Sequence, residues 1–188
     1  MRLMRMRIIS ISVWLMVSTS VFAGANSLSD TVYEDPDGFV AAAFAGSPPA
    51  PKALWIDAEL RAALHSVLGH PPTGLRMRYW GQDGRTVWVL DEIGKHRPIT
   101  SGVVIDHGAI EDIRVLVFRE SRGWEIRHAF FTRQFRDARL TSTGQLTQPI
   151  DGITGATLSV RAMQRIAKAA LLLHERSDEG SLTLANSR

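Results

Sequence analysis

The stretch Asp151-Gly152-Ile153-Thr154-Gly155-Ala156-Thr157-Leu158-Ser159, followed at once by a strongly patterned helix, is the most informative part of this chain. Gly155 permits a backbone turn that most residues resist, so Thr157 stands at the mouth of the helix. The amides of a helix's first turn have no partners within the helix and favour negative charge. A hydroxyl in this place can therefore carry a phosphate on the positive end of the helix.

The helix after this stretch has one apolar stripe and a polar opposite face, which predicts that it packs on a sheet. From Ser177 onward the sequence is polar, which predicts a flexible tail over 177–188. The expected stripe consists of Leu158, Ala162, Ile166, Ala169, Ala170 and Leu173.

The centre of the chain predicts about five strands, because alternating or β-branched runs are separated by glycine-containing turns. Successive strands flanked by helices favour a single small α+β domain with a central, mostly antiparallel sheet over a βαβ repeat. The expected strands are 75–80, 86–90, 99–105, 110–118 and 124–131.

Two helices are expected before the sheet. Asp35 and Pro36 open a short one, since aspartate caps a helix and proline suits its first turn. After a Gly/Pro-rich loop at 46–51, apolar residues recur at helical spacing over 56–68, with Asp57 as the cap. Together with the first hairpin, these elements make up an N-terminal segment, 24–94.

The first residues have the layout of a secretory signal peptide, expected over 1–23. Three arginines precede an apolar run, and small residues follow it. We expect cleavage after Ala23 first and after Ala25 second, which predicts a periplasmic or otherwise extracytoplasmic protein. The run is shorter than the roughly 20 residues that span a bilayer, which favours cleavage, but an uncleaved membrane anchor stays open.

Composition excludes several classes of function. The formal net charge of +3 falls to zero once the three signal-peptide arginines are removed, and no basic block marks a nucleic-acid partner. The absence of cysteine excludes disulfides, thiolate metal sites, iron–sulfur clusters and c-type haem. Neither a nucleophile elbow nor a glycine-rich nucleotide loop is present. No metal site is expected, because no metal-ligand spacing links His65, His70, His96, His107, His128 and His174.

The segment 151–157 resembles the flavin-attachment motif of FMN-binding domains, found in the C subunit of sodium-pumping NADH:quinone oxidoreductase and the G subunit of the Rnf complex. In that family a flavin transferase uses FAD and magnesium to join FMN, through its phosphate, to the last threonine of the motif. The resemblance therefore implies covalent FMN on Thr157, in a phosphoester-type threonine linkage.

The resemblance extends over about 95–175, so we expect an FMN-binding domain at 95–176. Pro98 to Phe118 resembles the family's opening hairpin, Phe131 to Phe135 its aromatic-Gln-Phe segment, and Glu120 to Glu125 a Glu-Thr-Pro-Gly segment. Arg122 departs from the usual proline, and Trp124 replaces a smaller residue. Residues 30–94 have no counterpart in those subunits, which favours a stand-alone periplasmic member.

Around Thr157 the expected cofactor-binding residues are Thr154, Gly155, Ala156 and Ser159. Ala156 keeps the flank of Thr157 small enough for a transferase to approach, and Ser159 can donate a further hydroxyl to the phosphate. Glu120 and Gly123 form a turn that can reach the isoalloxazine edge, and Trp124 can lie against the ring. Asp151 is assigned to transferase recognition or to holding the loop. Lys95 can add a positive charge near the flavin.

Each assignment has a structural alternative. Thr157 can be a plain helix cap, the Glu120 turn a plain surface turn, and Lys95 a solvated side chain. Trp124 can be a core residue, as Trp55, Trp80 and Trp88 are expected to be.

Three functions remain. The first is an exported electron carrier that exchanges electrons with a membrane-bound or haem-containing partner and that is not itself a substrate-specific enzyme. The second is a flavin-dependent reductase of a small acceptor such as a quinone or ferric chelate. The third is a flavin-free interaction module in which Thr157 only caps its helix.

Overall fold

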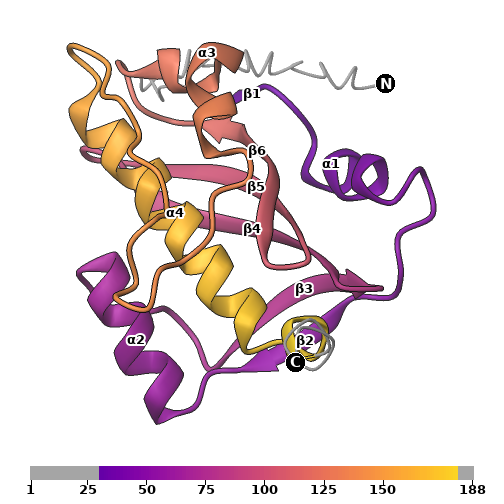
Figure 1. The fold of residues 1–188 in the computed structure, drawn as a ribbon. Coiled ribbons are helices and arrows are strands. Elements are labelled where there is room, and N and C mark those ends of the chain that lie inside the picture. Colours follow the sequence, from indigo (N-terminus) through magenta and orange to yellow (C-terminus); the bar gives the residue numbers. More distant parts are fainter. Residues whose placement is uncertain (1–29, 182–188) are drawn as a thin grey trace, which may run out of the picture.

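The computed structural model describes residues 30–181, which form a six-stranded antiparallel sheet with helices on both faces (Figure 1). The expected α+β class and single-domain architecture are confirmed. The strand order is β1-β6-β5-β4-β3-β2. The strands are β1 Thr31–Val32, β2 Lys52–Trp55, β3 Arg76–Gln82, β4 Arg85–Ile93, β5 Pro98–Asp106 and β6 Ala109–Phe118. The helices are α1 Pro36–Ala43, α2 Ala58–Leu68, η1 Trp124–Arg127, α3 Ala129–Thr132, η2 Arg133–Phe135 and α4 Thr157–Glu175.

The two faces of the sheet are covered unequally. The long helix α4, gold in Figure 1, lies across one face with α2 beside it, and they enclose the larger apolar core. The short helix α1 packs on β4 and β5 from the other face, over a smaller core that contains Phe39, Val40 and Trp80. Burial of these apolar groups supplies the main stabilising free energy of the fold.

Both N-terminal helices begin where the sequence predicts. The Asp35 carboxylate accepts a hydrogen bond from the Gly38 amide at 2.9 Å and caps α1, whose first turn contains Pro36. The Asp57 carboxylate accepts one from the Leu60 amide at 2.7 Å and caps α2. These caps satisfy amides that have no partner within the helix.

The four central strands were predicted within a few residues of their observed ends, and each pair is closed by a two-residue turn. Asp83 and Gly84 have φ angles of 52° and 80°, and His107 and Gly108 have φ angles of 47° and 79°. Such turns match the right-handed twist of the strands they join. The edge strands β1 and β2 were not predicted, because they span only two and four residues.

The strand expected at 124–131 is wrong. The segment instead forms η1 and the start of α3, and η2 follows. Ile126, Phe131 and Phe135 are fully buried here, whereas Phe130 is 61% exposed. Successive short helical turns bury these three residues under the end of the sheet, which an extended strand with alternating sides would not do.

Two expectations about the end of the chain are also wrong. Leu158 is 41% exposed and lies outside the buried stripe of α4, whereas the other five predicted stripe residues are buried. The tail expected from Ser177 is packed in its described part, 177–181. Ser177 is 1% exposed, and Glu179 is 4% exposed because its carboxylate binds Lys52 and the Gly84 amide.

The expected signal peptide lies outside the described residues. Among residues 30–181, no helix is both long and apolar enough to cross a bilayer. Within the same range, no three histidine or carboxylate side chains are grouped as metal ligands.

Candidate functional site

The loop that leads into α4 is held by one side chain of η2. The Asp151 amide donates a hydrogen bond of 2.7 Å to the Gln134 side-chain oxygen, so the loop and η2 are joined. Ile153 then accepts a hydrogen bond of 3.0 Å from the Ala156 amide, which closes a turn. Gly155 adopts a φ of 83° within this turn, as its glycine predicts. The side chain of Asp151 is exposed, where another protein can reach it.

Thr157 is the first residue of α4, and its side chain is exposed. The N-cap residue is Ala156, and no side chain forms a cap hydrogen bond here. The alternative in which Thr157 only caps the helix is therefore wrong. The first intrahelical bond runs from the Val160 amide to Ala156, so the preceding amides of this turn lack a capping side chain. Thr154, three residues earlier, is also exposed.

The turn after β6 lies directly against this first turn of α4. A Cβ added at Gly123 would lie 2.4 Å from the Ser159 Oγ and 3.6 Å from the Ala156 Cβ. Gly123 also has a φ of 88°, so its site requires glycine for both conformation and space. Ala156 and Ser159 are almost fully buried at this contact. Four of the predicted cofactor-binding residues, Gly123, Ala156, Thr157 and Ser159, are thus brought together.

Glu120 has a role that the sequence did not predict. Its Oε1 accepts hydrogen bonds from the amides of Lys95, His96 and Arg97 at 2.5, 2.6 and 2.9 Å. Burial alone would raise the pKa of Glu120, but these three hydrogen bonds outweigh it and hold that pKa below its usual value. The ionised carboxylate therefore ties the turn between β4 and β5 to the end of β6. The Lys95 side chain is exposed beside it.

Trp124 is not a core residue, since it is 43% exposed. Its ring meets the His128 ring edge-on at 5.4 Å, and the Arg127 guanidinium lies 5.3 Å from its centroid. His128 in turn stacks on the exposed Phe130 at 6.1 Å. We call Trp124, His128 and Phe130 the aromatic rim. It begins one residue after Gly123 and so borders the start of α4.

A buried carboxylate fastens the middle of α4 to the sheet. Glu92, whose side chain is 1% exposed, forms an ion pair with Arg165 of α4 at 2.9 Å and another with His70 at 3.1 Å. Arg165 also donates to the Ile93 carbonyl at 2.8 Å. The Pro71 carbonyl and Glu92 raise the pKa of His70 against the opposing effect of burial. No spacing in the sequence links these residues, which meet only in the folded chain.

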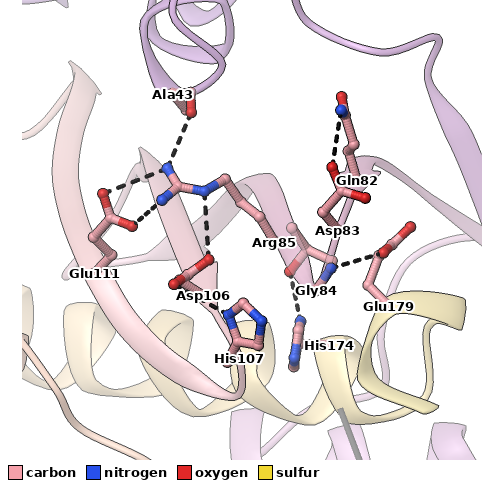
Figure 2. Close-up of polar contacts among 11 residues, drawn as sticks. Ala43, Gln82, Asp83, Gly84, Arg85, Asp106, His107, Glu111, His174 and Glu179 are labelled. Atoms are coloured by element: carbon pink, nitrogen blue, oxygen red, sulfur yellow. Dashed lines mark hydrogen bonds and ion pairs between the residues drawn. The ribbon is translucent and has the colours of Figure 1, made fainter. Parts of the chain in front are cut away.

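At the far end of α4, His174 and Glu179 are buried and each forms a hydrogen bond with the sheet (Figure 2). His174 Nδ1 and the Thr86 hydroxyl are 2.8 Å apart, and that hydroxyl accepts a hydrogen bond from Trp88. Burial lowers the pKa of His174 to about 4, so its ring is neutral at pH 7. Its Nε2 is buried without a hydrogen-bond partner among the described residues. Glu179 accepts a 3.1 Å hydrogen bond from the Gly84 amide.

A search of curated proteins gives no match. Residues 94–172 match the family model of the FMN-binding domain. The match begins just before the turn that Glu120 holds, and it contains Gly123, the aromatic rim and the start of α4, all of which lie together in the structure. Residues 94–172 of this chain therefore belong to the FMN-binding domain family.

Proposed function

We propose that Thr157 carries FMN covalently and that the protein is an exported electron carrier. The observation that carries this proposal is the exposed Thr157 hydroxyl at an uncapped helix N-terminus, inside a segment of the FMN-binding domain family. A capping threonine would have its hydroxyl engaged with the backbone. Here that hydroxyl is open to an approaching transferase.

The attachment follows from a balanced exchange at phosphorus. The Thr157 Oγ1 attacks the FMN phosphorus of FAD in a magnesium-dependent transferase. A P–O bond to threonine forms, the P–O bond to AMP breaks, and AMP leaves while a base of the transferase takes the hydroxyl proton. The phosphodiester that results keeps one negative charge, which the amides of the first turn of α4 stabilise.

The surrounding residues fit a flavin held at this point. Gly123 has no side chain, so the turn after β6 packs directly against Ser159 and brings Trp124 close to the start of α4. Trp124 offers an exposed ring face of the kind that stacks on an aromatic cofactor. Ser159 is almost fully buried against Gly123, so its hydroxyl is positioned more for packing than for solvent. FMN accepts two electrons and releases them singly, which suits exchange between a membrane reductase and a haem partner.

The test is the intact mass of the protein from cells that also express a flavin transferase. We expect the wild type to gain the mass of one FMN less water and Thr157→Ala to gain nothing. Thr73→Ala is the control, because Thr73 is an exposed threonine outside the attachment motif, and this variant should still be loaded. Loading of Thr157→Ala, or an unloaded wild type beside an active transferase, would contradict the covalent proposal.

The carrier role is tested separately on the loaded protein. Voltammetry should show reversible reduction and reoxidation, whereas mixing with small quinones or ferric chelates should give only slow, unselective exchange. Rapid turnover of one such acceptor would identify a reductase instead. If the mass measurement shows no attached FMN, the carrier proposal fails as well. If the mass measurement succeeds but voltammetry or the acceptor assay gives the opposite result, only the role of the bound flavin changes.

A further inference from the structure

On the face of the sheet that α1 occupies elsewhere, β2 and the first part of β3 carry exposed side chains that no helix within residues 30–181 covers. α1 packs mainly on β4 and β5, and its buried cluster reaches β3 only at Trp80. Alternation along β2 and β3 turns one set of side chains to this open face. The set consists of Ala53 and Trp55 from β2 and their cross-strand neighbours Arg78 and Arg76 from β3. We call these four residues the Arg–Trp face.

The Arg–Trp face carries positive charge without matching acids. On the part of the same sheet face near α1, arginines are neutralised: Arg85 pairs with Glu111 (Figure 2), and Arg114 pairs with Glu34. In contrast, neither Arg76 nor Arg78 forms an ion pair with any residue in 30–181. Arg78 lies 5.1 Å above the Trp80 ring, which fixes its guanidinium over the sheet.

The shape of this surface is concave. The small Ala53 side chain leaves a groove of about 260 Å³, lined by Pro51, Lys52, Ala53, Arg76 and Arg78. Trp55, the cross-strand neighbour of Arg76, is 65% exposed, although it was expected in the core. Tryptophan and arginine are the residues that most often dominate the binding energy of protein interfaces.

We propose that the Arg–Trp face docks an acidic surface of a partner protein. Carboxylates of the partner enter the groove over Ala53 and pair with Arg76 and Arg78, whose planar guanidinium groups match carboxylate geometry. The partner covers Trp55 and removes its exposed apolar area from water. An anionic bilayer fits less well, because the site is hollow, and Lys52 beside it is already paired with Glu179.

The Arg–Trp face lies far from the proposed flavin site at the start of α4. Lys52 of β2 contacts Glu179, beyond the C-terminal end of α4, whereas Thr157 begins that helix. A helix of 19 residues is roughly 28 Å long. A partner seated on the Arg–Trp face therefore leaves the start of α4 and the aromatic rim accessible.

The test uses the full chain expressed without a flavin transferase, so its outcome does not depend on the flavin proposal. The probe is an acetylated hexapeptide of alternating glutamate and serine, titrated at low salt. NMR should show saturable shifts of the Trp55 indole N–H and of the Nε–H groups of Arg76 and Arg78. Raising the salt should weaken binding, since exposed pairs are screened over a Debye length of about 10 Å at 0.1 M.

The double variant Arg76→Glu with Arg78→Glu should weaken peptide binding at least about fivefold, because two exposed pairs are lost and repulsion is added. The matched control is Arg136→Glu, an exposed arginine on another part of the molecule, which should change binding less than about twofold. Three results would overturn the proposal: absent shifts at these groups, an equal loss in Arg136→Glu, or no peptide binding together with binding to phosphatidylglycerol vesicles that the double variant abolishes.

Discussion

The two ends of α4 are built in opposite ways. At the N-terminal end, Thr157 is exposed, no side chain caps the helix, and small residues face the Gly123 turn. At the C-terminal end, His174 is 1% exposed, and the chain continues into Glu179, which is bound to β2 and to the Gly84 turn. The helix is therefore anchored by its middle and its C-terminal end.

This difference shows how a small domain can present an exposed hydroxyl without weakening its fold. In the first turn of α4 only Ser159 is buried, and the apolar packing of the helix begins at Val160, so the exposed Thr157 takes no part in either contact. Regions that bind or react are drawn from the less stable parts of a structure, while the packed parts hold them in place. Four experiments test this contrast between the two ends of α4.

The largest effect is expected from pH at the anchored end. The unfolded His174 has a pKa of 6.5 and the folded one a pKa of about 4, so the unfolded chain binds more protons between these values. Stability is then fully present above pH 6.5 and falls by about 3 kcal/mol on acidification to pH 4. Urea unfolding at several pH values should show this slope, and His174→Phe should flatten it. An equal slope in the variant would assign the loss to other groups, such as Glu179.

The second change tests the contact that joins the two halves of the site. Gly123→Ala should lower the free energy of unfolding by about 2 kcal/mol, through a left-handed backbone and a clash with the buried Ser159. Gly155→Ala is the control, because its φ is similar but nothing lies within 4 Å of an added Cβ. Its cost should be only about 1 kcal/mol, from backbone strain alone. Equal costs in thermal unfolding would show that the contact with Ser159 is unimportant.

The third experiment removes one charge, that of Glu179, at the C-terminal end of α4. Glu179→Gln removes the ion pair with Lys52 and weakens the bond to the Gly84 amide. We expect a loss of about 1 kcal/mol, since Glu179 is buried but Lys52 is partly solvated. Asp178→Asn, one residue away and exposed, should change stability by less than about 0.5 kcal/mol. A larger loss in Asp178→Asn would contradict this account.

The smallest effect is expected at the free end. Thr157→Val should alter the free energy of unfolding by less than about 0.5 kcal/mol, because its hydroxyl caps nothing and its side chain is exposed. If Thr157 carries FMN as proposed, the same variant loses all loading while it keeps its stability. A loss near 1 kcal/mol in denaturant unfolding would restore the capping role.

Local signals in the sequence were sufficient for most elements of the fold. The aspartates before α1 and α2, the Asp-Gly and His-Gly turns, and the apolar stripe of α4 each act over a few residues, and each was predicted correctly except for Leu158 in the stripe. The wrong prediction of a strand at 124–131 also came from a local signal. Trp124, Ile126, His128 and Phe130 alternate as a strand does, but the residues that decide the conformation are the buried aromatics Phe131 and Phe135 packing under the sheet.

The sequence predicted which residues belong to the site but not which of them contact one another. The attachment motif and the turn at Gly123 were both singled out, yet nothing local shows that Gly123 touches Ser159 across 36 residues of sequence. Glu120 was assigned to the flavin, and the structure shows its carboxylate occupied by the amides of residues 95–97. Contacts between distant segments depend on the whole fold, so neither one could be read from a motif.

The contact of Gly123 with the first turn of α4 also has a consequence for the order of maturation. Until α4 has packed, Thr157 lies on a chain with no turn of Gly123 behind it and no helix N-terminus to receive a phosphate. The folded start of α4 therefore exists only once the chain has been made through to the residues that anchor this helix. If Thr157 carries FMN as proposed, folding must come first and modification second, because the transferase would then act on the folded protein.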